Sequence, residues 1–134
     1  MRETLWGYHA DLGVTLFLLV LLRGVWGLWN LSNRPTEAGP MGCAAKVGHA
    51  GLYTLMVIVP VLKIIGSAGG TRGFSYLGLQ IFPARDVAIA WTKTILEWHG
   101  TFGWILTALV LGHICAAIIW HHLIKRDDVL KRMA

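Results

Sequence analysis

Two histidines stand fourteen residues apart in the apolar segment EWHGTFGWILTALVLGH, at positions His99 and His113. On an α-helix that spacing is about four turns, so both imidazoles face the same side, about 21 Å apart along the axis. Ionisable side chains inside a membrane segment usually belong to a working site. The two histidines therefore predict a functional site whose ligand accepts imidazole nitrogen.

The first apolar segment repeats this spacing with a histidine and an arginine. Arg23 follows His9 by fourteen residues, so the two side chains share one face of a helix. The guanidinium of Arg23 could pair with an acidic group of a cofactor, because arginine binds carboxylates in a bidentate way. It could equally extend through the lipid to the membrane surface. From the residues alone, both interpretations stay open.

The composition is typical of a chain dissolved in lipid rather than in water. Of the 134 residues, 55% are hydrophobic and 14% are charged, and the mean hydropathy is +0.58. This length predicts a single domain, residues 1–134. The formal net charge of +5 comes mainly from bases in loops and tails, which orient a membrane protein, so we expect no nucleic-acid partner. Cys43 and Cys115 lie in separate regions and predict no disulfide.

Three stretches are long enough to cross about 30 Å of hydrocarbon as helices. They cover residues 5–31, 45–65 and 96–124. Because backbone groups in lipid must be satisfied within each segment, we expect an all-α integral membrane bundle of three transmembrane helices, kinked at Pro60. The glycine-rich segment GSAGGTRG ends the second helix and begins a loop of about thirty residues. Tryptophans typical of an aromatic belt mark the helix ends: Trp6, Trp26, Trp29, Trp98 and Trp120.

The distribution of bases predicts the orientation of the bundle in the lipid bilayer. One face carries six bases and the other carries four, so the positive-inside rule puts the C-terminus in the cytoplasm. The N-terminus, the long loop, His9 and His99 then lie toward the outer face. Since the first and third helices run parallel, we expect His9 and His99 to meet at similar depth. The six bases are Arg34, Lys46, Lys125, Arg126, Lys131 and Arg132, and the four are Arg2, Arg72, Arg85 and Lys93.

Haem iron is the ligand that this arrangement favours. Neutral imidazole is a good iron ligand, and two imidazoles on facing helices can hold a flat macrocycle between them. The predicted metal ligands are therefore His9 and His99, with His113 as a ligand of a second haem. The chain has no Cys-x-x-Cys-His attachment motif, so the cofactor would be a b-type haem held without a covalent link.

These residues resemble the bacterial cytochrome b561 family over nearly the whole chain. The similarity lies in Tyr8-His9 with Arg23, in GHAGLYTLMVIVP, in FSYLGLQIFP, in EWHGTFGWILTALVLGH and in WHHLIKRDDVLKRM. The resemblance implies a four-helix membrane cytochrome with two haems, one of them bound by His9 and His99. The second would use His113 and a histidine from a preceding helix. That helix has no counterpart after Met1, so either the start is misassigned, another chain or a second copy supplies it, or the protein is a three-helix variant.

His49, at the start of the second helix, is an alternative partner for His113. Depth argues mildly against it, because His49 would lie about one turn into the membrane and His113 about two turns from its own helix end. Otherwise His49 is hydrogen-bonded to a neighbour or faces a quinone. His121 and His122 are expected at the interface, where one could line a quinone pocket. Lys63 departs from the small residue that the family tends to have after this proline, and a cation there could attract a propionate or an anionic substrate.

The resemblance implies an oxidoreductase of the bacterial inner membrane that passes single electrons from an outer-face donor, such as superoxide, to ubiquinone. Outer-face cations would steer a small anion inward or dock a partner protein. One alternative is a cytochrome b subunit that serves a hydrogenase or a dehydrogenase. Others are a non-redox transporter or channel, with histidines that relay protons or bind zinc, and a structural anchor. Few acids support a proton path, since Asp11 lies within the first helix and Glu97 only borders the third.

Overall fold

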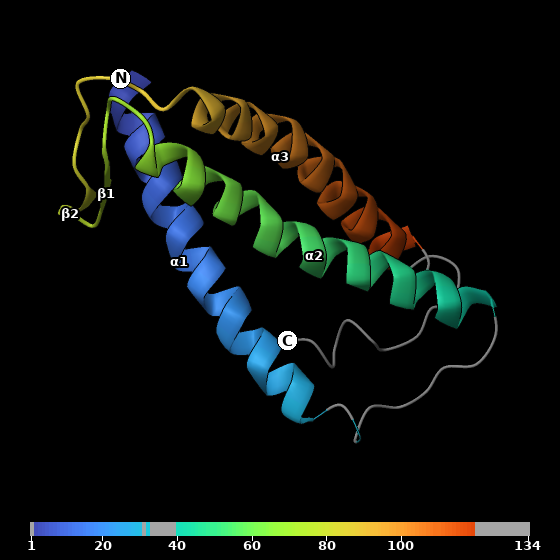
Figure 1. Ribbon diagram of the computed structural model, residues 1–134. Coiled ribbons are helices and arrows are strands. Elements are labelled where there is room, and N and C mark those ends of the chain that lie inside the picture. The colour runs from blue at the N-terminus through green and yellow to red at the C-terminus, as the bar shows by residue number, and fades with distance from the viewer. Residues whose placement is uncertain (1, 31, 33–39, 120–134) are drawn as a thin grey trace.

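The computed structural model describes residues 2–30, 32 and 40–119. In this part the chain forms three long helices and one small hairpin (Figure 1). The helices are α1 (Arg2–Trp29), α2 (Pro40–Ala68) and α3 (Ala90–Ala117), and the strands are β1 (Phe74–Tyr76) and β2 (Leu79–Phe82).

All three helices are long and apolar enough to cross a membrane. They contain 28, 29 and 28 residues, so each is about 40 Å long and exceeds the hydrocarbon core. Large apolar side chains cover their outer surfaces, and Trp104 on α3 is 78% exposed. Together with helices of this length, such a surface is typical of a protein that contacts lipid. The prediction of a helical membrane bundle is therefore confirmed.

All three helices begin earlier than the hydropathy pattern predicts, α1 by three residues and the other two by more. The structure begins α2 at Pro40 rather than near residue 45, and α3 at Ala90 rather than near residue 96. Proline suits the first turn of a helix, because its fixed φ angle fits and its missing N–H has no helical partner there. The predicted end of the third helix near residue 124 lies outside the described residues.

The helices pack unequally. α2 and α3 lie side by side and make most of the contacts between elements, whereas α1 packs on α2 less extensively and diverges from it toward the C-terminal end of α1 (Figure 1). Glycines allow the close approach of α2 and α3. A Cβ atom at Gly66 would collide with Leu96, and one at Gly69 would collide with Thr92. The start of α3 is tied to the end of α2 by a 3.0 Å hydrogen bond from the Ile89 N–H to the Gly69 carbonyl.

The connection between α2 and α3 contains an antiparallel hairpin that the sequence analysis did not predict. Its register pairs Tyr76 with Leu79 and leaves Leu77 and Gly78 as a two-residue loop. Both loop residues have positive φ angles, 48° and 81°, as a type I′ turn requires. Leucine is uncommon in that conformation. Because the turn has Leu-Gly in place of the usual Asn-Gly or Asp-Gly, the sequence carries no clear signal for a hairpin.

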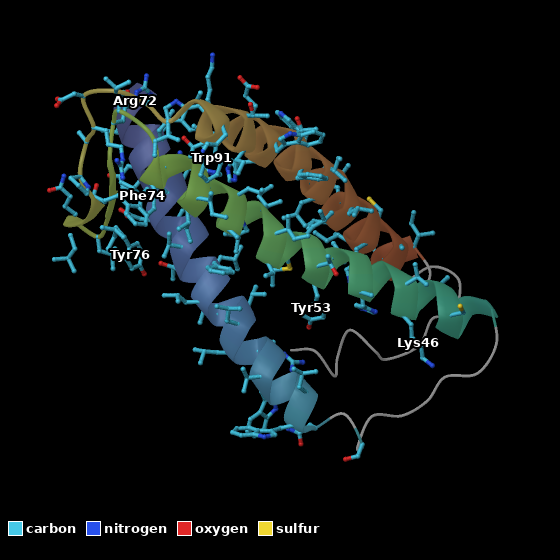
Figure 2. All side chains as sticks on the ribbon, viewed as in Figure 1. Lys46, Tyr53, Arg72, Phe74, Tyr76 and Trp91 are labelled. Carbon is cyan, nitrogen blue, oxygen red and sulfur yellow. The ribbon has the colours of Figure 1, made fainter. Side chains whose placement is uncertain are left out.

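Side chains of α1 hold the hairpin against the bundle. The Leu77 N–H donates a 3.0 Å hydrogen bond to the Asp11 carboxylate, and the hydroxyls of Thr15 and Tyr76 lie 3.0 Å apart. Figure 2 shows Phe74 and Tyr76 beside α1. Asp11, the acid that stands alone within the first apolar segment, therefore anchors the hairpin.

Candidate functional site

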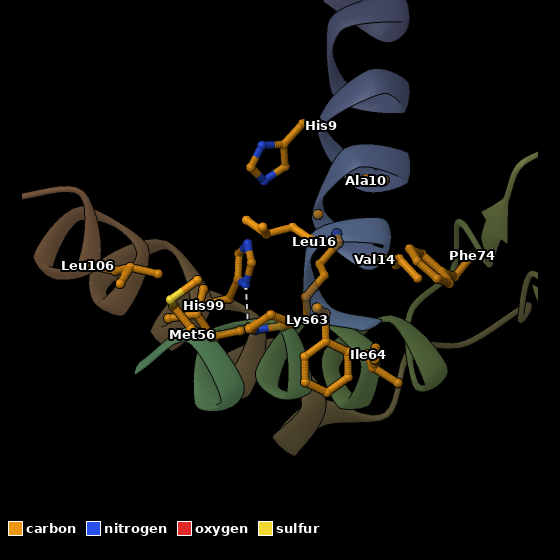
Figure 3. A pocket seen from close by; sticks show the side chains of 14 residues that line it. His9, Ala10, Val14, Leu16, Met56, Lys63, Ile64, Phe74, His99 and Leu106 are labelled. Atoms are coloured by element: carbon orange, nitrogen blue, oxygen red, sulfur yellow. Dashed lines mark hydrogen bonds between the residues drawn. The ribbon is translucent and has the colours of Figure 1, made fainter. Parts of the chain in front are cut away.

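The structure brings His9 and His99 together between α1 and α3. Their ring centroids are 6.2 Å apart and the ring planes make an angle of 75°. Both helices begin at the same end of the bundle (Figure 1), so residues that follow each helix start by similar distances lie at similar depth. Figure 3 shows the two rings with nitrogen atoms pointing toward one another. His9 and His99 therefore lie close together, as expected from the sequence.

A backbone carbonyl fixes the orientation of the His99 ring. Nδ1 of His99 lies 2.8 Å from the carbonyl oxygen of Val59 on α2 (Figure 3). Because a carbonyl only accepts, Nδ1 carries the proton and donates it, which leaves the lone pair on Nε2. Metal-binding histidines commonly use their second nitrogen in this way, and the contact raises their basicity as ligands. The His99 ring is thus held with the lone pair of Nε2 free to bind a metal.

The two rings line a cavity with about 720 Å³ of empty space, counting the part that is open to its surroundings. Its remaining wall is mostly apolar and comes from α1, α2, α3 and β1, with Phe17, Met56, Phe74 and Leu106 among its members. The polar side chains on the wall are the two histidines and Lys63. A large apolar cofactor that needs two imidazoles and carries acidic groups fits this lining.

A second histidine pair lies further along the bundle. The rings of His49 and His113 have centroids 5.1 Å apart and an interplanar angle of 70°. They line a cavity of about 700 Å³ together with Arg23, Tyr53 and Met56. Met56 lines both cavities, so the two sites adjoin across its side chain.

His49 lies beside His113, a pair that the expected depths did not favour. Because α2 begins at Pro40, His49 lies about two and a half turns into the helix, not one, and faces His113 directly. The expected depth came from placing the helix start by hydropathy. The signal that could have corrected it is Pro40 itself, a residue favoured at the first helical position.

Pairs of histidines select the kind of metal that could bind. Within residues 2–30 and 40–119, no three or more His, Cys, Asp or Glu side chains gather into a metal cluster. Zinc sites take three or four protein ligands, whereas haem iron brings four nitrogens of its own and needs two axial ligands. Two metal–nitrogen bonds of about 2 Å, lengthened by the radii of two rings, separate ring centroids by about 6 Å. His9 and His99 match that separation, and His49 and His113 are about 1 Å closer.

The other predicted residues divide between the two cavities. Arg23 lines the His49–His113 cavity and Lys63 lines the His9–His99 cavity. The Val59 carbonyl and Phe74 could not be predicted from the sequence, because both reach the site through tertiary packing. His121 and His122 lie outside the described residues.

The comparisons with known proteins agree on one family. A family model for prokaryotic cytochrome b561 matches residues 1–134. The chain is 28% identical over 140 residues to cytochrome b561 homolog 1 of Escherichia coli strain K12, covering 99% of this chain and 74% of that protein. It is also 28% identical over 128 residues to cytochrome b561 homolog 2 of the same strain, covering 93% and 68%.

Proposed function

Because the chain belongs to the prokaryotic cytochrome b561 family, and is thus a membrane b-type haem cytochrome of electron transfer, we propose that His9 and His99 are axial ligands of its haem. The observation that carries this proposal is the facing pair of rings, one of them already oriented by the Val59 carbonyl. When bound, the haem supplies a centre that gains and loses one electron.

The residues around the cavity contribute binding, orientation and the exclusion of water. His9 and His99 come from different helices and would hold the cofactor from opposite sides. The apolar wall excludes water and lowers the local dielectric, which strengthens the effect of every nearby charge on the reduction potential. These are the means by which a protein tunes a haem.

We propose superoxide as the electron donor and ubiquinone as the acceptor, in a bacterial inner membrane with the C-terminus in the cytoplasm. Two superoxide ions would each lose one electron to become dioxygen, and the quinone would gain two electrons and two protons to become a quinol. Exposed cations near the His9 end, Arg72 and Lys93, support an anionic donor, because positive surface charge raises the local concentration of anions. The same cations would suit an acidic partner protein, which is the alternative of a cytochrome b subunit in a larger enzyme.

The second histidine pair supports a second haem bound by His49 and His113. Arg23 lines that cavity and could bind an acidic group there, which favours the cofactor interpretation of this residue over extension to the interface. The rings must separate by about 1 Å for iron to enter between them.

Haem quantitation of purified variants tests the ligand proposal. We expect His9→Ala and His99→Ala each to lose one haem per chain and the matching low-spin bands of the dithionite-reduced spectrum. The matched control is Cys115→Ala, because Cys115 is exposed on α3 close to His113 and lines neither cavity. Unchanged haem content in both histidine variants would refute the assignment.

A liposome assay tests the donor and the acceptor. Wild-type protein reconstituted with ubiquinone should form quinol when superoxide is generated outside, and His99→Ala should not. If haem-loaded protein reduced quinone only in the presence of an added dehydrogenase or hydrogenase, the subunit alternative would replace the proposal.

A further inference from the structure

Lys63 is a cation inside a membrane-spanning helix. It stands five residues before the end of α2 and is half-buried. Its side chain lines the cavity of His9 and His99, and Figure 3 shows it reaching from α2 toward α1. A charged side chain at such a position is costly in lipid and normally has a partner.

The protein offers Lys63 no partner of opposite charge in the part that the structure describes. Its charged neighbour is Arg72, which has the same sign. The polar side chains on the cavity wall are His9, His99 and Lys63, so no carboxylate lines the cavity. This end of the cavity therefore has an excess of positive charge, which a bound anion would balance.

Extension of Lys63 to the membrane surface is a weaker explanation. Side chains on a helix tilt toward its N-terminus, and the N-terminus of α2 is at the far end of the bundle from the hairpin. The bond that begins the Lys63 side chain thus leads toward the middle of the span. The side chain lies against the cavity, where the two histidines already point.

We propose that the ammonium group of Lys63 is the counter-ion of a carboxylate on the haem held by His9 and His99. The inference rests on the proposed function, since it requires a haem in that cavity. Haem carries two propionate carboxylates, and an ammonium–carboxylate pair in an apolar cavity is a strong, charge-assisted contact. Neutralising a carboxylate near the iron favours the reduced state, so Lys63 raises the reduction potential of this haem.

The first arm of the test is a redox titration of purified holoprotein. We expect Lys63→Met and Lys63→Gln to lower the ratio of reduced to oxidised haem about tenfold at a fixed potential, equivalent to about 59 mV for one electron. Lys63→Arg should preserve the ratio, because it keeps the charge. The matched control is Lys46→Met on the same helix, which removes an exposed cation that lines neither cavity.

The second arm identifies the anion. Protein produced without haem is loaded with either haem or haem dimethyl ester, whose carboxylates are blocked. The difference between wild type and Lys63→Met should be present with haem and vanish with the ester. A difference that persists with the ester would overturn the propionate assignment in favour of a free anion such as superoxide. No difference with haem would overturn any counter-ion role.

The two proposals fail in distinguishable ways. Full haem content in His9→Ala and His99→Ala would show that no haem is bound by these residues, whatever the effect of Lys63 variants. Loss of haem in those variants together with equal potentials in Lys63→Met and wild type would keep the ligand assignment and reject the counter-ion.

Discussion

The two histidine pairs sit in one bundle, yet they are prepared for a ligand to different degrees. His9 and His99 have the separation that two axial ligands need, and His99 is held by a backbone carbonyl. His49 and His113 are closer together, and neither ring makes a hydrogen bond within the residues described here. His99 of the first pair is thus oriented by the backbone, whereas the second pair lies about 1 Å closer than two axial ligands would.

The difference between the two histidine pairs follows from the packing of α1 along its length. Near its N-terminus α1 contacts the hairpin, which adds Phe74 to the cavity wall. Toward its C-terminus α1 diverges from α2, and Figure 2 shows Tyr53 on the side of α2 that faces this space. A site closed on several sides fixes its ligands, and a site closed on fewer sides leaves them mobile.

Removing either histidine of the second pair should have the largest effect, a change in haem content. If His49 and His113 bind a second haem, then His49→Ala and His113→Ala each lower the haem content from two per chain to one and leave the potential of the remaining haem unchanged. Pyridine haemochrome quantitation and a redox titration measure both quantities. Retention of two haems in His49→Ala would mean that another group completes the His113 site.

Widening the contact between α2 and α3 should weaken both sites together. A Cβ atom at Gly66 would collide with the backbone of Leu96, so Gly66→Ala should destabilise the protein by about 1–3 kcal/mol through overpacking. Thermal loss of both haem absorption bands in detergent measures it. Gly100→Ala serves as the control, because a Cβ atom there meets no atom within 4 Å. A loss confined to one haem would contradict a shared α2–α3 framework.

Releasing the hairpin should affect only the first site. Asp11→Ala removes the acceptor of the Leu77 N–H and should cost about 1 kcal/mol, the usual net value of such a hydrogen bond. Haem loss from the His9–His99 site should become easier, while the second site is unaffected. Asp11→Asn retains an oxygen acceptor and should behave nearly as wild type. Equal haem release from both sites in Asp11→Ala would show that the hairpin does not act locally.

The smallest expected effect is that of Tyr53→Phe. Tyr53 lines the second cavity, and the substitution removes only its hydroxyl, so we expect a change below about 0.5 kcal/mol in stability. If a second haem binds in that cavity, a redox titration should show a small shift in its potential and none in that of the first. A larger shift in the first haem would mean that the two cavities are coupled through Met56.

Helix periodicity accounts for most of what the sequence predicted. The pairing of His9 with His99 could be predicted because, in a membrane, depth along a helix is nearly a one-dimensional coordinate. The approach of His49 to His113 was harder to predict, since it depends on where α2 begins, and the structure begins α2 at Pro40 rather than near residue 45.

Tertiary contacts account for what could not be predicted. The Val59 carbonyl leaves no trace in residue types, because every residue has one. The hairpin depends on a turn at Leu77 with an unfavourable residue type, and its attachment depends on a distant carboxylate. Asp11 stands out in the sequence as an isolated acid, but its role depends on the Leu77 N–H, 66 residues away along the chain.

The sparse packing of α1 has a consequence for biogenesis. α2 and α3 form a closely fitted antiparallel unit of their own, whereas α1 shares little protein surface with them beyond the hairpin end. A cofactor that contacts α1 together with α2 and α3 would add to the free energy that docks α1. Since a ligand that binds only the assembled state stabilises it by mass action, cells short of cofactor should accumulate chains whose first helix is undocked and open to membrane proteases.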